Sequence, residues 1–223
     1  MNDRLAVFDL DGTLVDTAPD LIDTTNEVLR AQGLPPVAPE TLRNFIGLGA
    51  RVMVDSALRA QFDQHDMDLD RLHRDFIAEY KTRLTRRSRP FDEITAALPV
   101  LKNAGVELAV CTNKAEGLAR QLLSELNLAG SFGTITGGDT FDVSKPHPGH
   151  LLKTIDLAGG TPERTVFVGD SRVDFETARA ANVPIVGLSY GYSDTPMRDL
   201  GPDRLCDPGE DIAAAILALF PEE

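Results

Sequence analysis

The stretch Ala6–Thr17 reads AVFDLDGTLVDT, so that a short apolar run passes directly into Asp9 and Asp11 and then Gly12. An apolar run of this length is typical of a strand buried on both faces. Residues i and i+2 of a strand share a face, which predicts backbone positions about 6–7 Å apart for the two aspartates. Two carboxylates within about 4 Å repel by around 4 kcal/mol at an effective dielectric near 20. A bound cation or a shared proton would remove this cost, whereas an ordinary polar turn would explain the pair equally well.

Five more strand-like runs follow along the chain. Together with 4–9 they lie at 106–113, 132–138, 165–170 and 183–189, with a weaker one at 203–207. Helical patterns at 114–126, 147–160 and 171–182 alternate with them. This alternation predicts an α/β fold with a doubly wound parallel sheet, a Rossmann-like core.

One interval is too long for a simple crossover between parallel strands. Nearly a hundred residues separate Asp9 from the strand-like run at Val106–Val110, whereas a βαβ unit takes about 30. The interval carries helical patterns at 19–33, 50–61 and 69–84. We therefore predict a catalytic core of residues 1–16 and 90–223 and an inserted helical cap at 17–89, with hinges near Asp16 and at 86–92.

Composition excludes several classes of partner. The 223-residue chain has a formal net charge of −13, which repels nucleic acid and anionic lipid. No stretch reaches the roughly 18 apolar residues of a membrane span, and no signal peptide is visible, so a cytoplasmic protein without membrane or nucleic-acid partners is expected. Cys111 and Cys206 lie far apart in the sequence and are expected to be free thiols.

Polar residues follow the later strands as well. Thr112 and Asn113 come directly after one strand, where they could hold an anion or simply cap the next helix. Lys145 precedes a proline-braced turn and could neutralise phosphate, or could be an ordinary solvated lysine. His147 and His150 fit the start of a helix better than a metal site, because no further ligand accompanies them.

A second pair of carboxylates resembles the first in its placement. Asp170 ends the apolar run TVFVG, and Asp174 follows one helical turn later. Ligands of open α/β sheets bind beyond the carboxyl ends of the strands. Strands that end at Asp9, Thr112 and Asp170 are therefore expected to meet at one oxygen-lined pocket. Oxygen ligands without cysteine favour Mg²⁺.

Other known motifs do not fit the chain. An EF-hand loop would need a third ligand before Gly12 and a glutamate where Asp20 stands. No Walker A motif is present, and GLGARV at 47–52 lacks the third glycine of a dinucleotide fingerprint and a preceding strand.

The four elements in this order resemble the haloacid dehalogenase superfamily: DLDGT at 9–13, the Thr112 strand end, the KP dipeptide at Lys145, and GDSRVD at 169–174. The resemblance covers the whole chain, and the insertion resembles the helical cap of that family. FIGLGAR (45–51), KPHP, VGDSR and SYGYSD (189–194) are most similar to the bacterial phosphoglycolate phosphatases. Val173 departs from their pattern, in which asparagine is usual.

The resemblance implies a role for each motif. Asp9 would be the nucleophile that forms an aspartyl-phosphate, and Asp11 the acid and base. Mg²⁺ would bind the Asp9 carboxylate, the Asp11 carbonyl oxygen and Asp170. Asp174 would hold metal-bound water or orient Lys145.

The same resemblance implies the substrate contacts. Thr112, Asn113 and Lys145 would bind the phosphate group of a small phosphorylated substrate. Arg51 in the cap is a candidate to bind a carboxylate or the phosphate of the substrate, although a cation on a helix surface is the simpler interpretation. Arg172 is a similar candidate, with an ion pair in the core as the simpler interpretation.

The implied activity is Mg²⁺-dependent hydrolysis of a phosphomonoester, with 2-phosphoglycolate as the expected substrate. A pyrophosphatase or a broad sugar-phosphate phosphatase would share the same core residues. A phosphomutase and a receiver-like phosphoacceptor fit less well. The alternative outside catalysis is a module that binds Mg²⁺ or phosphate without turnover. The presence of both Asp9 and Asp11 favours an enzyme.

Overall fold

A six-stranded parallel sheet forms the centre of the molecule in the computed structural model, which describes residues 4–62 and 64–221. Its strands in spatial order are β5 (Thr134–Thr136), β4 (Glu107–Cys111), β1 (Leu5–Phe8), β6 (Thr165–Gly169), β7 (Ile185–Leu188) and β8 (Arg204–Cys206). All neighbouring strands run parallel. The predicted doubly wound α/β class is confirmed, and all six predicted strands are present, including the weak one.

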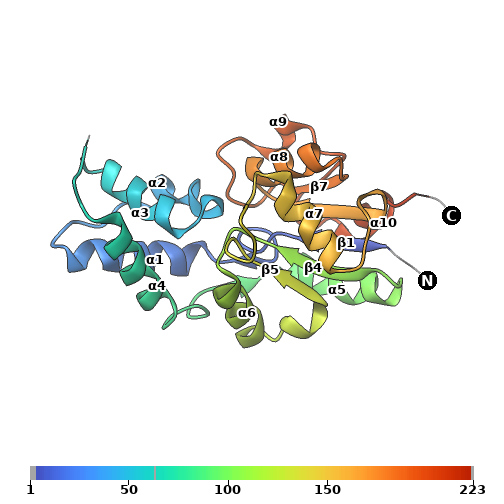
Figure 1. Ribbon diagram of the computed structural model, residues 1–223, viewed down its shortest axis with the longest axis horizontal. Helices are drawn as coiled ribbons and strands as arrows, with labels where there is room; N and C mark the ends of the chain where they lie inside the picture. Colours follow the sequence, from blue (N-terminus) through green and yellow to red (C-terminus); the bar gives the residue numbers. More distant parts are fainter. Residues whose placement is uncertain (1–3, 63, 222–223) are drawn as a thin grey trace.

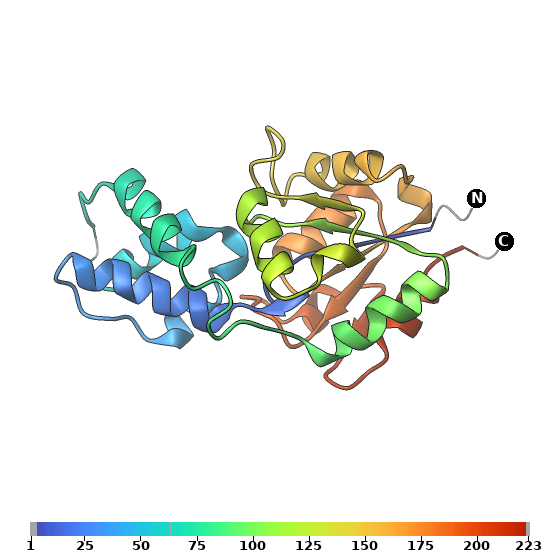
Figure 2. The ribbon, with the colours of Figure 1, turned by 90° about the horizontal axis from the view of Figure 1, so that it is seen from below.

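Helices cover both faces of the sheet (Figures 1 and 2). One face packs against α7 (Pro148–Leu157) and α8 (Arg172–Ala181), and the other packs against α5 (Asp92–Asn103), α6 (Glu116–Glu125) and α10 (Ile212–Leu217). The short α9 (Met197–Leu200) lies beside β7. Strand β1 shows why an unbroken apolar run was needed: Leu5 and Val7 enter one hydrophobic cluster and Ala6 and Phe8 the other.

A lobe of helices lies beyond one end of the sheet, at the left of Figure 1. It contains α1 (Ala18–Ala31), α2 (Pro39–Arg43), a 3₁₀ turn (Ile46–Leu48), α3 (Ala50–Arg59) and α4 (Leu69–Tyr80). Helices α1, α3 and α4 pack against one another. The three predicted helices are therefore present, whereas α2 and the 3₁₀ turn were not predicted.

The chain enters and leaves this lobe through two segments that lie side by side. They are β2 (Val15–Asp16) and β3 (Arg89–Pro90), which form a two-stranded antiparallel sheet at the positions where hinges were expected. Asp20, fully buried near the start of α1, accepts hydrogen bonds from the backbone N–H of Arg87 and from the N–H and hydroxyl of Ser88. These bonds fasten the returning segment to the first helix of the lobe.

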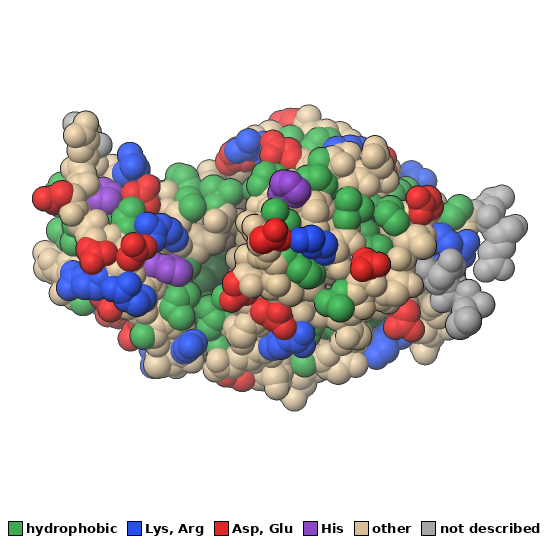
Figure 3. Space-filling view, in the orientation of Figure 1, with side chains coloured by type: hydrophobic (Ala, Val, Ile, Leu, Met, Phe, Trp, Pro, Cys, Tyr) green, Lys and Arg blue, Asp and Glu red, His purple; other side chains and the backbone are tan. Residues whose placement is uncertain are grey.

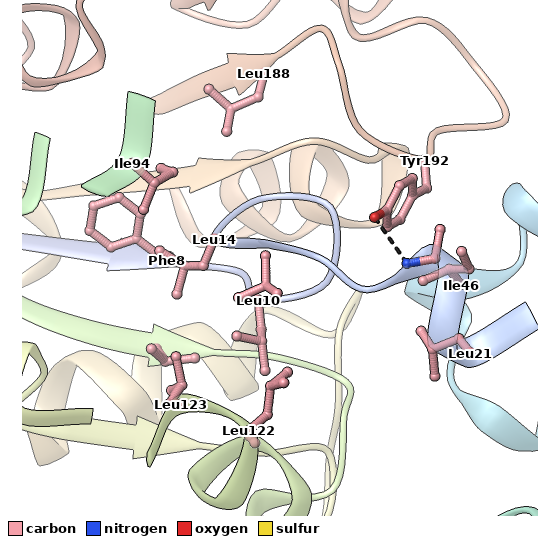
Figure 4. Close-up of a cluster of buried hydrophobic side chains, with 14 of the residues drawn as sticks. Phe8, Leu10, Leu14, Leu21, Ile46, Ile94, Leu122, Leu123, Leu188 and Tyr192 are labelled. Atoms are coloured by element: carbon pink, nitrogen blue, oxygen red, sulfur yellow. Dashed lines mark hydrogen bonds between the residues drawn. The ribbon is translucent and has the colours of Figure 1, made fainter. Parts of the chain in front are cut away.

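One cluster of buried hydrophobic side chains joins the two lobes (Figure 4). Phe8, Leu10 and Leu14 on the sheet side continue into Leu21 and Ile46 of the helical lobe. The two parts therefore share a core as well as a pair of linkers.

Three local features differ from or refine the sequence-based expectations. Helix α5 was not predicted; Pro99 interrupts its helical pattern but lies on its exposed side. The N-cap of α6 is Ala115, so neither Thr112 nor Asn113 caps that helix. His147 caps α7, as a helix-start residue should.

Other sequence expectations concern the cysteines and a membrane. Cys111 and Cys206 are both free and buried. Among the described residues, no helix combines the length and the apolar character that crossing a membrane requires.

Candidate active site

The loop that follows β1 carries the two aspartates of the opening motif. The backbone N–H of Asp9 still donates to the carbonyl of Val168 at 2.9 Å, so this residue remains aligned with the end of β6. Gly12 then turns with a φ of +90°, and a Cβ there would lie 2.5 Å from an Asp170 carboxylate oxygen. Only glycine allows the loop to approach Asp170 this closely.

Asp9 is held by a buried lysine. Asp9 Oδ1 forms an ion pair with Lys145, at 2.9 Å from Nζ, and the same Nζ donates a hydrogen bond to Asp174 at 2.6 Å. The second Asp174 oxygen accepts hydrogen bonds from the N–H and hydroxyl of Ser171 at 3.1 and 2.6 Å. Burial lowers the pKa of Lys145, but the two carboxylates raise it above its usual value. Lys145 is therefore a fixed cation between two acids, and the solvated-lysine interpretation is wrong.

Asp170 lies beside this group and is oriented by two donors. The hydroxyl of Thr13 donates to one of its oxygens at 2.6 Å, and the backbone N–H of Tyr192 to the other at 2.7 Å. Burial raises the pKa of Asp170 well above its usual value, and the nearby Asp174 and Asp9 raise it further. Burial likewise raises the pKa of Asp9 to about 6, while Lys145 acts in the opposite direction.

Asp11 has a separate partner. Lys114 Nζ donates to its two carboxylate oxygens at 2.8 and 3.1 Å, and the Thr17 hydroxyl donates at 2.6 Å. Burial lowers the pKa of Lys114, but Asp11 raises it above its usual value. The repulsion expected between Asp9 and Asp11 is thus relieved by a separate lysine on each.

The carboxylates outnumber these cations. The buried set contains four acids (Asp9, Asp11, Asp170, Asp174) and two lysines (Lys114, Lys145). The formal charge of this set is −2 when all six side chains are ionised. Carboxylate oxygens of Asp9, Asp170 and Asp174 lie within 4.8 Å of one another, an arrangement that could hold a metal ion. Asp174 accepts three hydrogen bonds, from Lys145 and Ser171, whereas each Asp170 oxygen accepts one, so Asp9 and Asp170 are the better candidates for direct ligands.

Thr112 and Asn113 lie at the end of β4, next to this group. The Thr112 hydroxyl is almost fully buried and accepts from the Lys114 N–H at 3.3 Å. The Asn113 amide donates to the carbonyls of Lys145 and of Gly47 in the helical lobe, at 3.0 and 3.2 Å. Asn113 therefore connects the segment that carries Lys145 with the helical lobe.

A cavity of about 820 Å³ opens from the site into the space between the lobes, where Figure 3 shows the surface hollowed. Asp9, Asp11 and Thr112 line its core side. The lining from the helical lobe is mainly apolar, with the side chains of Leu21, Ile46, Met53, Phe76, Ile77 and Tyr80. Three basic side chains of the same lobe also line the cavity: Arg51, His73 and Lys81. Water and a small polar molecule can therefore reach the two aspartates from this side.

The two candidate arginines differ in position. Arg51 lines the cavity, where it forms an exposed ion pair with Asp70 of the same lobe. Arg172 is outside the lining of this cavity and pairs with Asp194 at 2.7 Å and with Glu176 at 3.4 Å on the surface. Arg172 thus forms ion pairs with other residues of the core, as the simpler interpretation predicted, and these pairs lie on its surface.

Sequence reasoning identified six residues that the structure brings together: Asp9, Asp11, Thr112, Lys145, Asp170 and Asp174. It did not select Lys114. It also missed Tyr192, whose backbone orients Asp170. The partners of these two residues lie 103 and 22 positions away in the sequence, so no local pattern marks them.

Comparison of the sequence with known proteins identifies relatives over most of the chain. The family model described as "Haloacid dehalogenase-like hydrolase" matches residues 6–188. A phosphoglycolate phosphatase of Agrobacterium fabrum is 46% identical over 97% of this chain and 92% of its own length. One from Mesorhizobium japonicum is 43% identical, covering 92% of this chain and 91% of its own.

Comparison with solved structures identifies a protein of similar description. A crystal structure from Haemophilus somnus, described as a predicted phosphoglycolate phosphatase, superposes with a TM-score of 0.87 at 30% identity. The match covers 98% of this chain and 98% of that one. With the DLDGT loop, the buried lysine and the second pair of aspartates in one site, the chain belongs to the haloacid dehalogenase-like hydrolase family.

Proposed function

We propose that this protein is a Mg²⁺-dependent phosphomonoester hydrolase that converts 2-phosphoglycolate to glycolate and phosphate. One observation carries the proposal: Asp9 and Asp11 lie at the floor of one cavity, and each is held by its own buried lysine. A single loop therefore offers a carboxylate for attack and a second one for proton transfer. The relatives at 46% and 43% identity support this choice of substrate.

In the first step, an Asp9 carboxylate oxygen attacks phosphorus and the bond from phosphorus to the glycolate oxygen breaks. Asp11 donates its proton to the departing oxygen, so that glycolate leaves as the alcohol. The product on the enzyme is an aspartyl-phosphate at Asp9.

In the second step, water attacks the phosphorus of this intermediate, and Asp11, now ionised, accepts a proton from the water. The bond from phosphorus to the Asp9 oxygen breaks and inorganic phosphate is released. Both aspartates return to their starting states, which balances the cycle.

Positive charge and donors around the phosphate come from the strand ends. Lys145, positioned by Asp174, would neutralise phosphate charge next to Asp9. The Thr112 hydroxyl would donate to a phosphate oxygen, and Asn113 would keep the surrounding loop in place. Phosphoryl transfer depends mainly on such positioning and neutralisation.

The acidic group fits a Mg²⁺ ion. A hard divalent cation would balance the formal charge of −2, and it prefers the oxygen ligands that this group offers. Burial and the neighbouring carboxylates raise the pKa values of Asp9 and Asp170, and a bound cation would compensate their negative charge. Asp9, the Asp11 carbonyl and Asp170 would hold it, with Asp174 behind them. When bound, Mg²⁺ reduces the repulsion between the carboxylate nucleophile and the anionic ester.

Residues 17–89 would act as the cap that covers the substrate. Their side chains form most of the far wall of the cavity, and the polypeptide passes between this lobe and the core through the paired linkers β2 and β3. Arg51 would bind the substrate carboxylate after exchanging its exposed partner Asp70.

The test is phosphate release from phosphoglycolate, pyrophosphate, a hexose phosphate and p-nitrophenyl phosphate, with and without Mg²⁺. Asp9→Asn should abolish release, because an amide cannot act as the nucleophile. Asp142→Asn is the matched control, since Asp142 is an exposed carboxylate paired with Lys153. Mg²⁺-dependent release led by phosphoglycolate supports the full proposal.

Two other results would contradict part or all of the proposed function. Equal turnover of all four esters would retain the nucleophile but remove the substrate assignment. Phosphate binding without release in the native protein would contradict hydrolysis and favour a binding module.

A further inference from the structure

Lys114 forms a contact that the proposed reaction does not yet use. Its side chain is 5% exposed, and its ammonium group lies between Asp11 of the core and Tyr80 of the helical lobe. The distance from Nζ to the centre of the Tyr80 ring is 4.7 Å. Tyr80 is the last residue of α4 and is 1% exposed. A single buried cation thus connects the proposed acid and base with the cap.

The donors around Asp11 are unevenly shared between its two oxygens. Oδ1 accepts from the Thr17 hydroxyl at 2.6 Å and from Lys114 at 2.8 Å. Among the described residues, Oδ2 accepts from Lys114 alone, at the longer distance of 3.1 Å. Oδ1 therefore accepts two hydrogen bonds, one for each of its lone pairs, whereas Oδ2 accepts one and keeps a lone pair free to carry a transferable proton.

The contacts of Lys114 explain how its charge can be buried at low cost. Buried ammonium groups are stable only when paired and hydrogen-bonded, and the Tyr80 ring adds the attraction between a cation and the face of an aromatic ring. Removal of the charge would leave the Asp11 side chain with Thr17 as its remaining side-chain donor. One donor to one oxygen does not fix rotation of the carboxyl group.

We propose that Lys114 is a positioning residue that orients the Asp11 carboxyl group for proton transfer through Oδ2, and that Tyr80 holds Lys114 in place from the cap. This inference rests on the proposed function, because it assigns a role within that reaction. Lys114 acts through Asp11 and need not touch the phosphate.

The leaving group separates this role from phosphate binding. Glycolate must be protonated as it leaves, whereas p-nitrophenolate leaves without a proton, so only the former needs Asp11 in the first step. Both esters need Asp11 in the second step. Loss of positioning should therefore slow both steps with phosphoglycolate and only the second with p-nitrophenyl phosphate.

The experiment is rapid-mixing kinetics of Lys114→Met with both esters in the presence of Mg²⁺. We expect a burst of p-nitrophenolate at a rate within about threefold of native, followed by turnover slowed roughly 10- to 100-fold. With phosphoglycolate, formation of the phosphoenzyme itself should slow by a similar factor, with KM nearly unchanged. The burst amplitude counts folded, active enzyme, so a folding defect cannot imitate the result.

Three further variants sharpen the comparison. Lys114→Arg keeps a positive charge and should restore part of the lost rate. Tyr80→Leu removes the ring and should act like a weaker Lys114→Met. Lys153→Met removes a lysine that is 48% exposed and paired with Asp142, and should change neither rate.

Two results would overturn the inference. If the burst with p-nitrophenyl phosphate slows as much as the reaction with phosphoglycolate, Lys114 binds the phosphate or merely supports the fold. If Lys114→Met leaves both esters at native rates, Asp11 does not depend on it. Failure of the proposed function has a different signature, because the native protein would then hydrolyse neither ester.

Discussion

At the scale of single residues, the site separates two aspartates of one loop into different surroundings. Asp9 lies with Asp170 and Asp174 around Lys145, where burial raises its pKa to about 6. Asp11 lies on the other side of the loop and is bound by Lys114. A cation that enters the site is attracted to the group with surplus negative charge, which leaves Asp11 available for proton transfer.

The raised pKa of Asp9 predicts how Mg²⁺ stabilises the fold. A carboxyl whose folded pKa rises from 3.8 to about 6 stabilises the protein below 3.8, and this contribution is lost as pH rises through 6. Protons and Mg²⁺ compete for the same oxygens, so Mg²⁺ should raise the melting temperature by about 5–10 °C near pH 7.5 at saturating concentration. Near pH 5 the increase should be much smaller.

Thermal unfolding with and without Mg²⁺ at the two pH values measures this difference. Asp170→Asn should lose most of the increase at pH 7.5, since it removes a proposed ligand. An equal increase at both pH values, or one that Asp170→Asn retains, would show that Mg²⁺ acts elsewhere on the acidic surface.

The sequence identified the residues of the site better than their partners. Asp9 and Asp170 follow apolar strand-like runs, and strand ends of a parallel sheet meet at one edge. Lys114 was not selected as a site residue. Its burial depends on Asp11 and on Tyr80 of the cap, and contacts between such distant segments leave no local pattern.

At the scale of elements, the loop Ser189–Asp194 after β7 connects the acidic group with the linkers. The Tyr192 backbone donates to Asp170, while its hydroxyl donates to Asp16 of β2 and accepts from the Ala18 N–H at 3.2 Å, the bond drawn in Figure 4. One residue therefore connects the proposed metal site, through its backbone, with the entrance of the cap, through its side chain.

The elements themselves followed from the sequence to different degrees. Buried parallel strands appear as unbroken apolar runs, so all six were found. Helix α5 was missed because Pro99 interrupts a pattern whose buried positions, Ile94, Ala97, Leu98 and Leu101, become clear only once they pack on the sheet. The pairing of β2 with β3 depends on two segments more than seventy positions apart.

Removal of the Tyr192 hydroxyl should weaken the fold. Tyr192→Phe leaves the buried Ala18 N–H without its acceptor, which predicts a loss of about 1–3 kcal/mol in the free energy of unfolding. Urea denaturation measures it. Tyr190→Phe in the same loop is the control, because the Tyr190 hydroxyl has no hydrogen-bond partner among the described residues. Equal losses for the two variants would contradict the linking role of Tyr192.

The same loop approaches Asp170 so closely that a methyl group cannot fit. A Cβ at Gly191 would lie 2.0 Å from an Asp170 oxygen, so Gly191→Ala must displace that carboxylate. A shift of about 1 Å in an active-site group costs roughly 100-fold in rate, which is the loss expected in Mg²⁺-dependent turnover. Gly130→Ala meets nothing within 4 Å and should keep native activity. Native turnover in Gly191→Ala would mean that Asp170 is not needed in its present position.

At the scale of the whole molecule, two features act against each other. The adjacent linkers β2 and β3 allow the cap to rotate as a unit, because both connections bend at the same place. The hydrophobic cluster that runs from Phe8 through Leu14 to Ile46 resists separation of the lobes. Motion is therefore expected to close the cavity rather than to open it further.

The cavity is too large for the proposed substrate as it stands. A volume of about 820 Å³ suits a drug-sized ligand, whereas 2-phosphoglycolate has only two carbon atoms. Water must be kept from the reacting groups until the second step, so the cap has to approach the core. Small-angle scattering should therefore give a smaller radius of gyration with Mg²⁺, vanadate and glycolate together than with Mg²⁺ alone. Asp170→Asn should show no such change, and superimposable profiles for the native protein would leave the cap as a fixed wall.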